Sequence, residues 1–248
     1  MASSSAASKC VKWILAGWTG FVCENLVLSE NRTFIIDKIG DARYHTMYNT
    51  LSTIACGSVA FGYMRYGPGR ILNNTGLVRS AVALTTASLG AIGLSQLLPT
   101  FQVPIGGNGS MRCPFDFQSG KGTPDDGGLV RVTRHPMLYS LGMFGLGVGL
   151  MSPYAGRLAL FSGPLLVAFV GTHHQDYRYR RGIGGSLTPE RDARTSNVPF
   201  YALLAGRQEW GKLVEEIKLP NCGVAMSVVA LLFLSRTRSS ALVKTIVK

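Results

Sequence analysis

Apolar residues are gathered into six runs along this chain, each bounded by charged or turn-forming residues. The runs cover residues 11–28, 47–64, 77–98, 138–151, 156–174 and 222–235. A helix that rises about 1.5 Å per residue needs about 20 apolar residues to cross a bilayer. Four runs approach this length, and the two short ones continue the pattern. We therefore expect an all-α integral membrane helical bundle with about six transmembrane helices.

Glycine is concentrated in one of the short runs, 138–151. It carries Gly142, Gly145, Gly147 and Gly149. Small residues let helix backbones approach closely in lipid. This segment is therefore predicted to be a helix that packs tightly against its neighbours.

The polar segments between the runs predict short interfacial helices and two extramembrane loops. An amphipathic stretch covers residues 34–39, and Trp210, Leu213, Val214 and Ile217 recur at helical spacing. The loops cover residues 99–137 and 175–220. The expected organisation is an N-terminal tail (1–10), a membrane domain (11–235) and a basic C-terminal tail (236–248).

The net charge of +12 is distributed unevenly over the predicted topology. With six crossings, the side of the membrane that holds both termini carries basic residues and no Asp or Glu. Basic loops favour the inner side, so we expect this side to face the cytoplasm, matrix or stroma. Basic residues near a membrane also attract anionic lipids. No nucleic-acid recognition element accompanies the charge. The expected partners are membrane lipids and other membrane protein subunits, and not nucleic acid.

Candidate chemistry lies at the ends of two runs, on the same predicted side of the membrane. Pro136 suits the first position of a helix, which places His135 at a helix N-terminus, beside free backbone amides. Ionisable residues within or beside membrane segments are functional candidates. The catalytic candidates are Glu24, His135 and His174. The candidates for binding lipid or another anion are Arg134, Arg178, Arg180 and Arg181.

Purely structural roles for these residues remain open. His135 would then bond a neighbouring loop, and Asp176 would pair with His173 and His174. Glu24 would pair with Arg134 or His174, because buried charges are paired or neutralised. The five cysteines show no metal-ligand spacing, so no metal site is predicted.

Several ordered motifs resemble the NnrU family over roughly residues 11–210. They are the string from Gly128 to Pro136, the pair His173-His174, the string from Arg194 to Phe200, and N-terminal strings such as Leu28–Arg32. This family includes the plastid and cyanobacterial 15-cis-zeta-carotene isomerases. The resemblance implies a multi-span membrane protein. In the isomerase branch it also implies haem b, held by two histidines, whose iron mediates cis-to-trans isomerisation of a polyene.

The resemblance assigns the two haem ligands to positions where this chain has no histidine. One position matches Val148, and the other falls in Cys23-Glu24-Asn25. Valine has no group that can ligate iron, and Glu is a poor replacement for imidazole. We therefore expect no cofactor, and haem b stays as the alternative that the resemblance implies.

Three functions remain as hypotheses. The favoured one is a non-catalytic accessory subunit of a larger organelle inner-membrane complex, with the mitochondrial respiratory chain ahead of a plastid complex. The alternative is a haem-dependent membrane isomerase of the zeta-carotene type. A methyltransferase of the isoprenylcysteine type would need a cofactor-binding segment near the C-terminus, where only the basic stretch Tyr177–Arg181 stands out.

Overall fold

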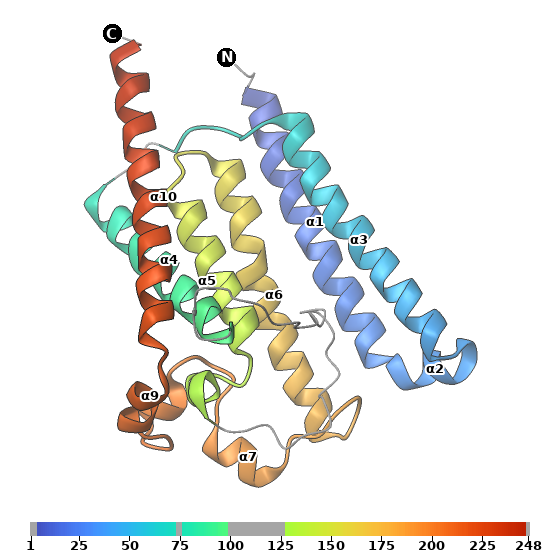
Figure 1. Cartoon of the computed structure of the whole chain (residues 1–248). Coiled ribbons are helices and arrows are strands. Elements are labelled where there is room, and N and C mark those ends of the chain that lie inside the picture. The colour runs from blue at the N-terminus through green and yellow to red at the C-terminus, as the bar shows by residue number, and fades with distance from the viewer. Residues whose placement is uncertain (1–3, 73–75, 99–126, 247–248) are drawn as a thin grey trace, which may run out of the picture.

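The computed structural model in Figure 1 describes residues 4–72, 76–98 and 127–246. In these ranges the chain is helical apart from turns and one isolated β-bridge between Ile71 and Tyr154. The long helices are α1 (Ser4–Glu30), α3 (Asp41–Tyr66), α4 (Leu77–Leu97), α5 (Pro136–Leu150), α6 (Ala155–Arg180) and α10 (Leu219–Ile246). The short ones are α2 (Arg32–Ile39), the 3₁₀ helix η1 (Gly128–Arg131), α7 (Pro189–Arg194), α8 (Tyr201–Leu204) and α9 (Trp210–Glu216).

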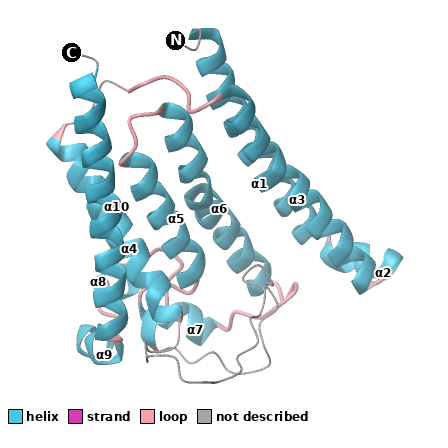
Figure 2. Ribbon diagram, turned by 45° about the horizontal axis from the view of Figure 1, so that its top comes forward, coloured by secondary structure: helices cyan, strands magenta, loops and turns pink. Residues whose placement is uncertain are grey.

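The long helices lie side by side, and both chain ends are at one end of the bundle (Figure 1). The short helices α2, α7, α8 and α9 lie at the opposite end (Figures 1 and 2). This arrangement confirms the predicted all-α bundle. Most of the loop expected at 99–137 lies outside the described residues.

Only three of the described helices are both long and apolar enough to cross a membrane: α4, α6 and the Leu219–Arg236 part of α10. Helix α5 is apolar but too short, and α1 and α3 are long but too polar. The expected count of about six crossings is therefore not confirmed. The bounds also differ, because α1 begins inside the expected tail 1–10 and α10 continues through the expected tail to Ile246.

Helices α1 and α3 form a pair, and several of their polar groups bond within the pair. The Trp13 indole N–H donates to the Ser58 carbonyl at 2.9 Å, and the Tyr44 hydroxyl donates to the Leu28 carbonyl at 3.1 Å. The Tyr48 hydroxyl donates to the Asn25 side-chain oxygen. The pair contacts the rest of the bundle mainly through α6. These polar groups thus bond between the two helices, whereas other polar side chains of α3, such as Arg43, Asn49 and Thr53, are exposed.

Glycines bring α4, α5 and α6 into backbone contact, as the glycine-rich run predicts. A methyl group added at Gly147 would overlap the backbone of Ala87 in α4. One added at Gly142 would come within 2.6 Å of the Leu165 Cα in α6. A side chain at either position would force the helices apart, and close approach is how helices associate in lipid.

We expect Gly147→Ala to lower the free energy of unfolding by about 1–3 kcal/mol, because the added methyl group overpacks the α4–α5 contact. The matched control is Gly57→Ala in α3, where an added methyl group meets nothing within 4 Å. This control should be stabilised by about 0.5–1 kcal/mol through helix propensity. Thermal unfolding in mild detergent, followed by circular dichroism, measures both changes. Equal stability of the two variants would contradict the close packing.

Candidate functional site

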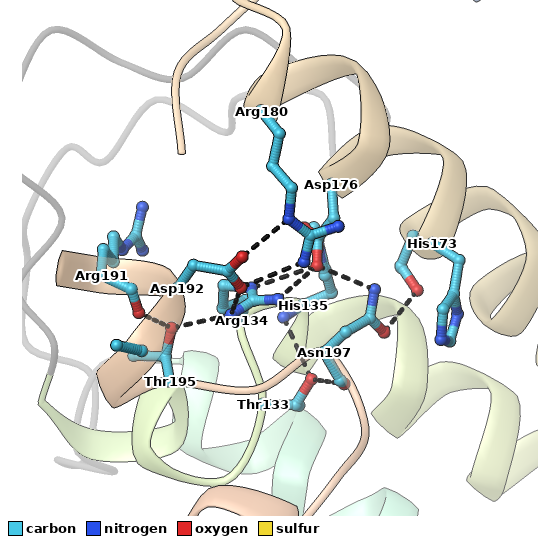
Figure 3. Close-up of polar contacts among 12 residues, drawn as sticks. Thr133, Arg134, His135, His173, Asp176, Arg180, Arg191, Asp192, Thr195 and Asn197 are labelled. Atoms are coloured by element: carbon cyan, nitrogen blue, oxygen red, sulfur yellow. Dashed lines mark hydrogen bonds and ion pairs between the residues drawn. The ribbon is translucent and has the colours of Figure 1, made fainter. Parts of the chain in front are cut away.

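The candidate site lies where α5 begins and α6 ends, at the bundle end opposite the chain termini (Figures 1 and 3). Pro136 occupies the first turn of α5 and His135 is its N-cap residue, as the sequence predicts. Segment 195–200 runs beside this turn. The Arg134 amide donates to the Ser196 carbonyl at 2.9 Å, and the Phe200 amide donates to the Val132 carbonyl at 2.8 Å. Backbone bonds thus hold the two loop segments together.

The carboxylate of Asp176, in α6, is the centre of the site (Figure 3). Its Oδ2 accepts from Arg134 Nη2 at 2.6 Å and Nε at 3.1 Å. Its Oδ1 lies 2.8 Å from His135 Nε2. The side chains of Arg134 and Asp176 are only 6% and 5% exposed. This is a buried, two-bonded arginine–carboxylate pair, a geometry that gives strong and directional hydrogen bonds.

A second carboxylate, from Asp192 in α7, binds the other side of the same arginine. Asp192 Oδ1 lies 3.1 Å from Arg134 Nη1, and Asp192 Oδ2 accepts from Arg180 Nε at 2.7 Å. The hydrogen bond from Arg180, with the nearby Arg134 charge, holds the pKa of the Asp192 carboxyl below its usual range. Two arginines and two carboxylates therefore alternate through the site, and their charges balance.

Asn197 connects this charged group to the neutral interior. Its amide nitrogen donates to Asp176 Oδ2 at 3.1 Å. Its side-chain oxygen accepts from the Tyr139 hydroxyl at 2.8 Å and the Thr172 hydroxyl at 2.9 Å. Asn197 is 6% exposed, so these bonds replace water. The side chain joins segment 195–200 to both α5 and α6.

Comparison with known proteins identifies the family of this chain. A family model described as NnrU protein matches residues 13–237, which is most of the chain. This chain belongs to the NnrU family. No curated protein and no solved structure matches it.

In this NnrU protein the motifs 128–136 and 194–200, far apart in the sequence, lie side by side in the site. The sequence singled out Arg134 and His135, and the structure brings both onto Asp176. It missed Asn197 as a site residue, although the string from Arg194 to Phe200 contains it. A buried asparagine beside a charged pair has no sequence pattern of its own, which explains the omission.

Three predicted pairings in the NnrU chain are wrong. Asp176 bonds Arg134 and His135 rather than His173 and His174. His173 Nδ1 lies 2.7 Å from the carbonyl of Phe169, and His174 Nε2 lies 3.7 Å from Glu30 Oε2. Rotation about the axis of α6 separates these residues, because Asp176 faces α5 whereas His174 faces α1.

Glu24 does not reach Arg134 or His174, contrary to the third prediction. Its Oε1 accepts from the Ser52 hydroxyl of α3 at 2.9 Å. The three catalytic candidates therefore occupy separate places: Glu24 between α1 and α3, His135 at the start of α5, and His174 between α6 and the end of α1.

The four arginines predicted to bind lipid or another anion also differ in their surroundings. Arg134 and Arg180 are neutralised within the site, and Arg181 bonds Glu30 Oε2 at 2.7 Å. Arg178 instead donates from Nη1 to the Ser29 carbonyl at 2.9 Å. Three of the four are thus already paired with carboxylates.

A second ion pair of the NnrU protein fixes the turn before the site. Glu216, at the end of α9, accepts from Arg131 Nε at 2.8 Å and from Nη2 at 2.7 Å. It also accepts from the Gly128 amide. These bonds, led by that from Arg131, lower the pKa of Glu216 from 4.5 to about 2.

We expect Asp176→Asn to lower the free energy of unfolding by about 3 kcal/mol, because it leaves the buried Arg134 charge undercompensated. The control is Asp37→Asn, an exposed position in α2 with the same change in charge. Surface substitutions usually change stability by about 0.5 kcal/mol or less. Denaturant unfolding in detergent measures the stability of both variants. An Asp176→Asn variant as stable as the unmodified protein would contradict a structural role for the pair.

Acidification should loosen the region around α9. A carboxyl whose pKa is lowered on folding stabilises the fold above its unfolded pKa. This contribution is lost as the pH falls through the folded pKa, that is, from about 4.5 towards about 2 for Glu216. Hydrogen exchange of the amides of residues 128–131 and 210–216 should therefore accelerate in this window. In Glu216→Gln this pH-dependent change should be smaller, and an unchanged pH profile would contradict the assignment.

Proposed function

We propose that this protein is a non-catalytic integral accessory subunit of a larger organelle inner-membrane complex, with the mitochondrial respiratory chain as the favoured assembly. The observation that carries the proposal is the closed hydrogen-bond network around Asp176. Both oxygens of this carboxylate are occupied by Arg134, His135 and Asn197.

In this network the strongest acid–base candidates, His135 and Asp176, bond each other. A general base must reach a proton of the substrate, directly or through one water. His135 Nε2 is instead directed at Asp176 Oδ1, and both side chains are nearly buried. Releasing either group would break a hydrogen bond between nearly buried side chains, which is costly in a protein interior. A structural role requires no such release.

Exposed apolar residues in the segment that follows α6 support docking to a neighbouring subunit. Leu204 and Val214 are 76% and 65% exposed, and Trp210 is 48% exposed. Helix α9 differs here from the expected amphipathic helix, because Leu213 is buried whereas Val214 faces outward. Apolar patches on the surface outside spanning helices mark interaction sites. An apolar surface on another membrane subunit would cover these side chains.

The residues at the positions that the resemblance assigns to haem ligands do not fit a bis-histidine site. Val148 is a buried aliphatic side chain. On α1, Glu24 bonds Ser52, and Asn25 donates to the Phe21 carbonyl at 2.8 Å. We derive no reaction step through haem. The isomerase alternative remains testable, because a haem-loaded protein has a characteristic absorption spectrum.

The test uses the tagged full-length chain in its native membranes, extracted with mild detergent and separated by blue-native electrophoresis. Co-migration with a large complex, identified by mass spectrometry, is the expected result. The double variant Leu204→Ser/Val214→Ser should dissociate from that complex. Phe34→Ser, at an equally exposed apolar position on α2, should remain bound. Migration as a single haem-containing chain would overturn the proposal and favour the isomerase.

A further inference from the structure

A cavity lies on the face of α6 opposite the Asp176 network. Its volume is about 50 Å³, and residues of α1, α3, α5 and α6 line it. One part of the wall is apolar and includes Phe21, Leu26, Leu138 and Val167. The other part is polar, and His174, Gln175 and Arg178 of α6 line it together with Asn25, Ser29 and Tyr48. The cavity therefore has the two-part character of a site for an amphiphile.

The polar part contains buried atoms without a hydrogen-bond partner. These are Gln175 Oε1 and Arg178 Nε, in residues that are 9% and 5% exposed. His174 Nε2 also makes no hydrogen bond, since Glu30 Oε2 is 3.7 Å away. Buried polar groups are normally satisfied, and leaving them unpaired is unfavourable. A bound group that accepts from Arg178 and donates to Gln175 would satisfy both.

The cavity carries positive charge, and the carboxylate at its edge, Glu30, lies 3.7 Å from His174 and is already bonded to Arg181. Arg178 is the one arginine among the four anion-binding candidates for which the described residues show no ion pair. Its guanidinium is held by the Ser29 carbonyl, which fixes its position without neutralising it. An anionic oxygen is the complementary ligand, because arginine binds phosphate with charge-assisted hydrogen bonds.

We propose that this cavity binds a phospholipid whose anionic headgroup also carries a hydroxyl, as in a phosphatidylglycerol. A phosphate oxygen accepts from Arg178 Nε, and the headgroup hydroxyl donates to Gln175 Oε1. The first part of an acyl chain lies against Phe21, Leu26 and Val167. The apolar wall favours a lipid over free phosphate, which would gain nothing from it. This inference is independent of the accessory-subunit proposal.

Gly171 provides a variant that closes the cavity without changing its polar groups. Gly171 lines the cavity, and a Cβ built there meets nothing within 4 Å. Gly171→Leu therefore extends into open space and occupies the position proposed for the acyl chain. The matched control is Gly57→Leu in α3, which also has open space but does not line the cavity. Arg178→Gln removes the cation, with Lys212→Gln on the exposed surface of α9 as its charge-matched control.

The experiment measures lipid binding to the purified full-length protein by native mass spectrometry. Dioleoylphosphatidylglycerol, dioleoylphosphatidylcholine and inorganic phosphate are added separately. The unmodified protein should retain phosphatidylglycerol in preference to phosphatidylcholine. Both Gly171→Leu and Arg178→Gln should weaken this binding by about tenfold or more, the loss expected for one charge-assisted hydrogen bond or a few apolar contacts. The two controls should bind as the unmodified protein does.

Three results would overturn the proposal. The first is equal retention of the two lipids by the unmodified protein. The second is undiminished phosphatidylglycerol binding by Gly171→Leu, which does not depend on whether Arg178→Gln folds. The third is displacement of the lipid by inorganic phosphate at equal concentration, which would indicate a simple anion site. Association with a larger complex is measured separately, so failure of this proposal leaves the accessory-subunit proposal untouched.

Discussion

The Arg134–Asp176 ion pair is the interaction on which the arrangement of this bundle end depends. Arg134 belongs to the turn before α5, and Asp176 lies in the last turns of α6. Through Asp192 and Asn197, the same pair holds α7 and the segment that follows it. Four stretches of chain thus meet at two buried charges. Such a pair adds little net stability compared with apolar packing, but it specifies one geometry, because each charge requires its partner.

In the middle of the bundle, glycine contacts rather than ion pairs constrain the structure. There the helices α4, α5 and α6 are held by close backbone approach at glycines. Packing of this kind fixes distance between helices, whereas the ion pairs fix the loops that leave them. The two devices divide the structure into a tightly packed apolar middle and a polar lobe whose shape is set by directional bonds.

The helices were largely predictable from the sequence, but the pairings between them were not. Apolar runs located the long helices, and Pro136 located the start of α5. Helices α1 and α3 are less apolar than α4, α6 and α10, and only part of their polarity, such as Asn25 and Tyr48, bonds inside the pair. The partner of Asp176 was missed because it depends on helix rotation. Residues four apart share a helix face, so His174 lies with Arg178 and apart from Asp176.

The internal bonding of α1 and α3 has a consequence for the order of biosynthesis. These helices are made before α6, and the Tyr44–Leu28, Tyr48–Asn25 and Ser52–Glu24 bonds need no later part of the chain. Helix α6, their main neighbour, begins only at Ala155. Helices α1 and α3 can therefore pair as soon as both are made, and α6 then packs against a pair whose internal bonds are already in place.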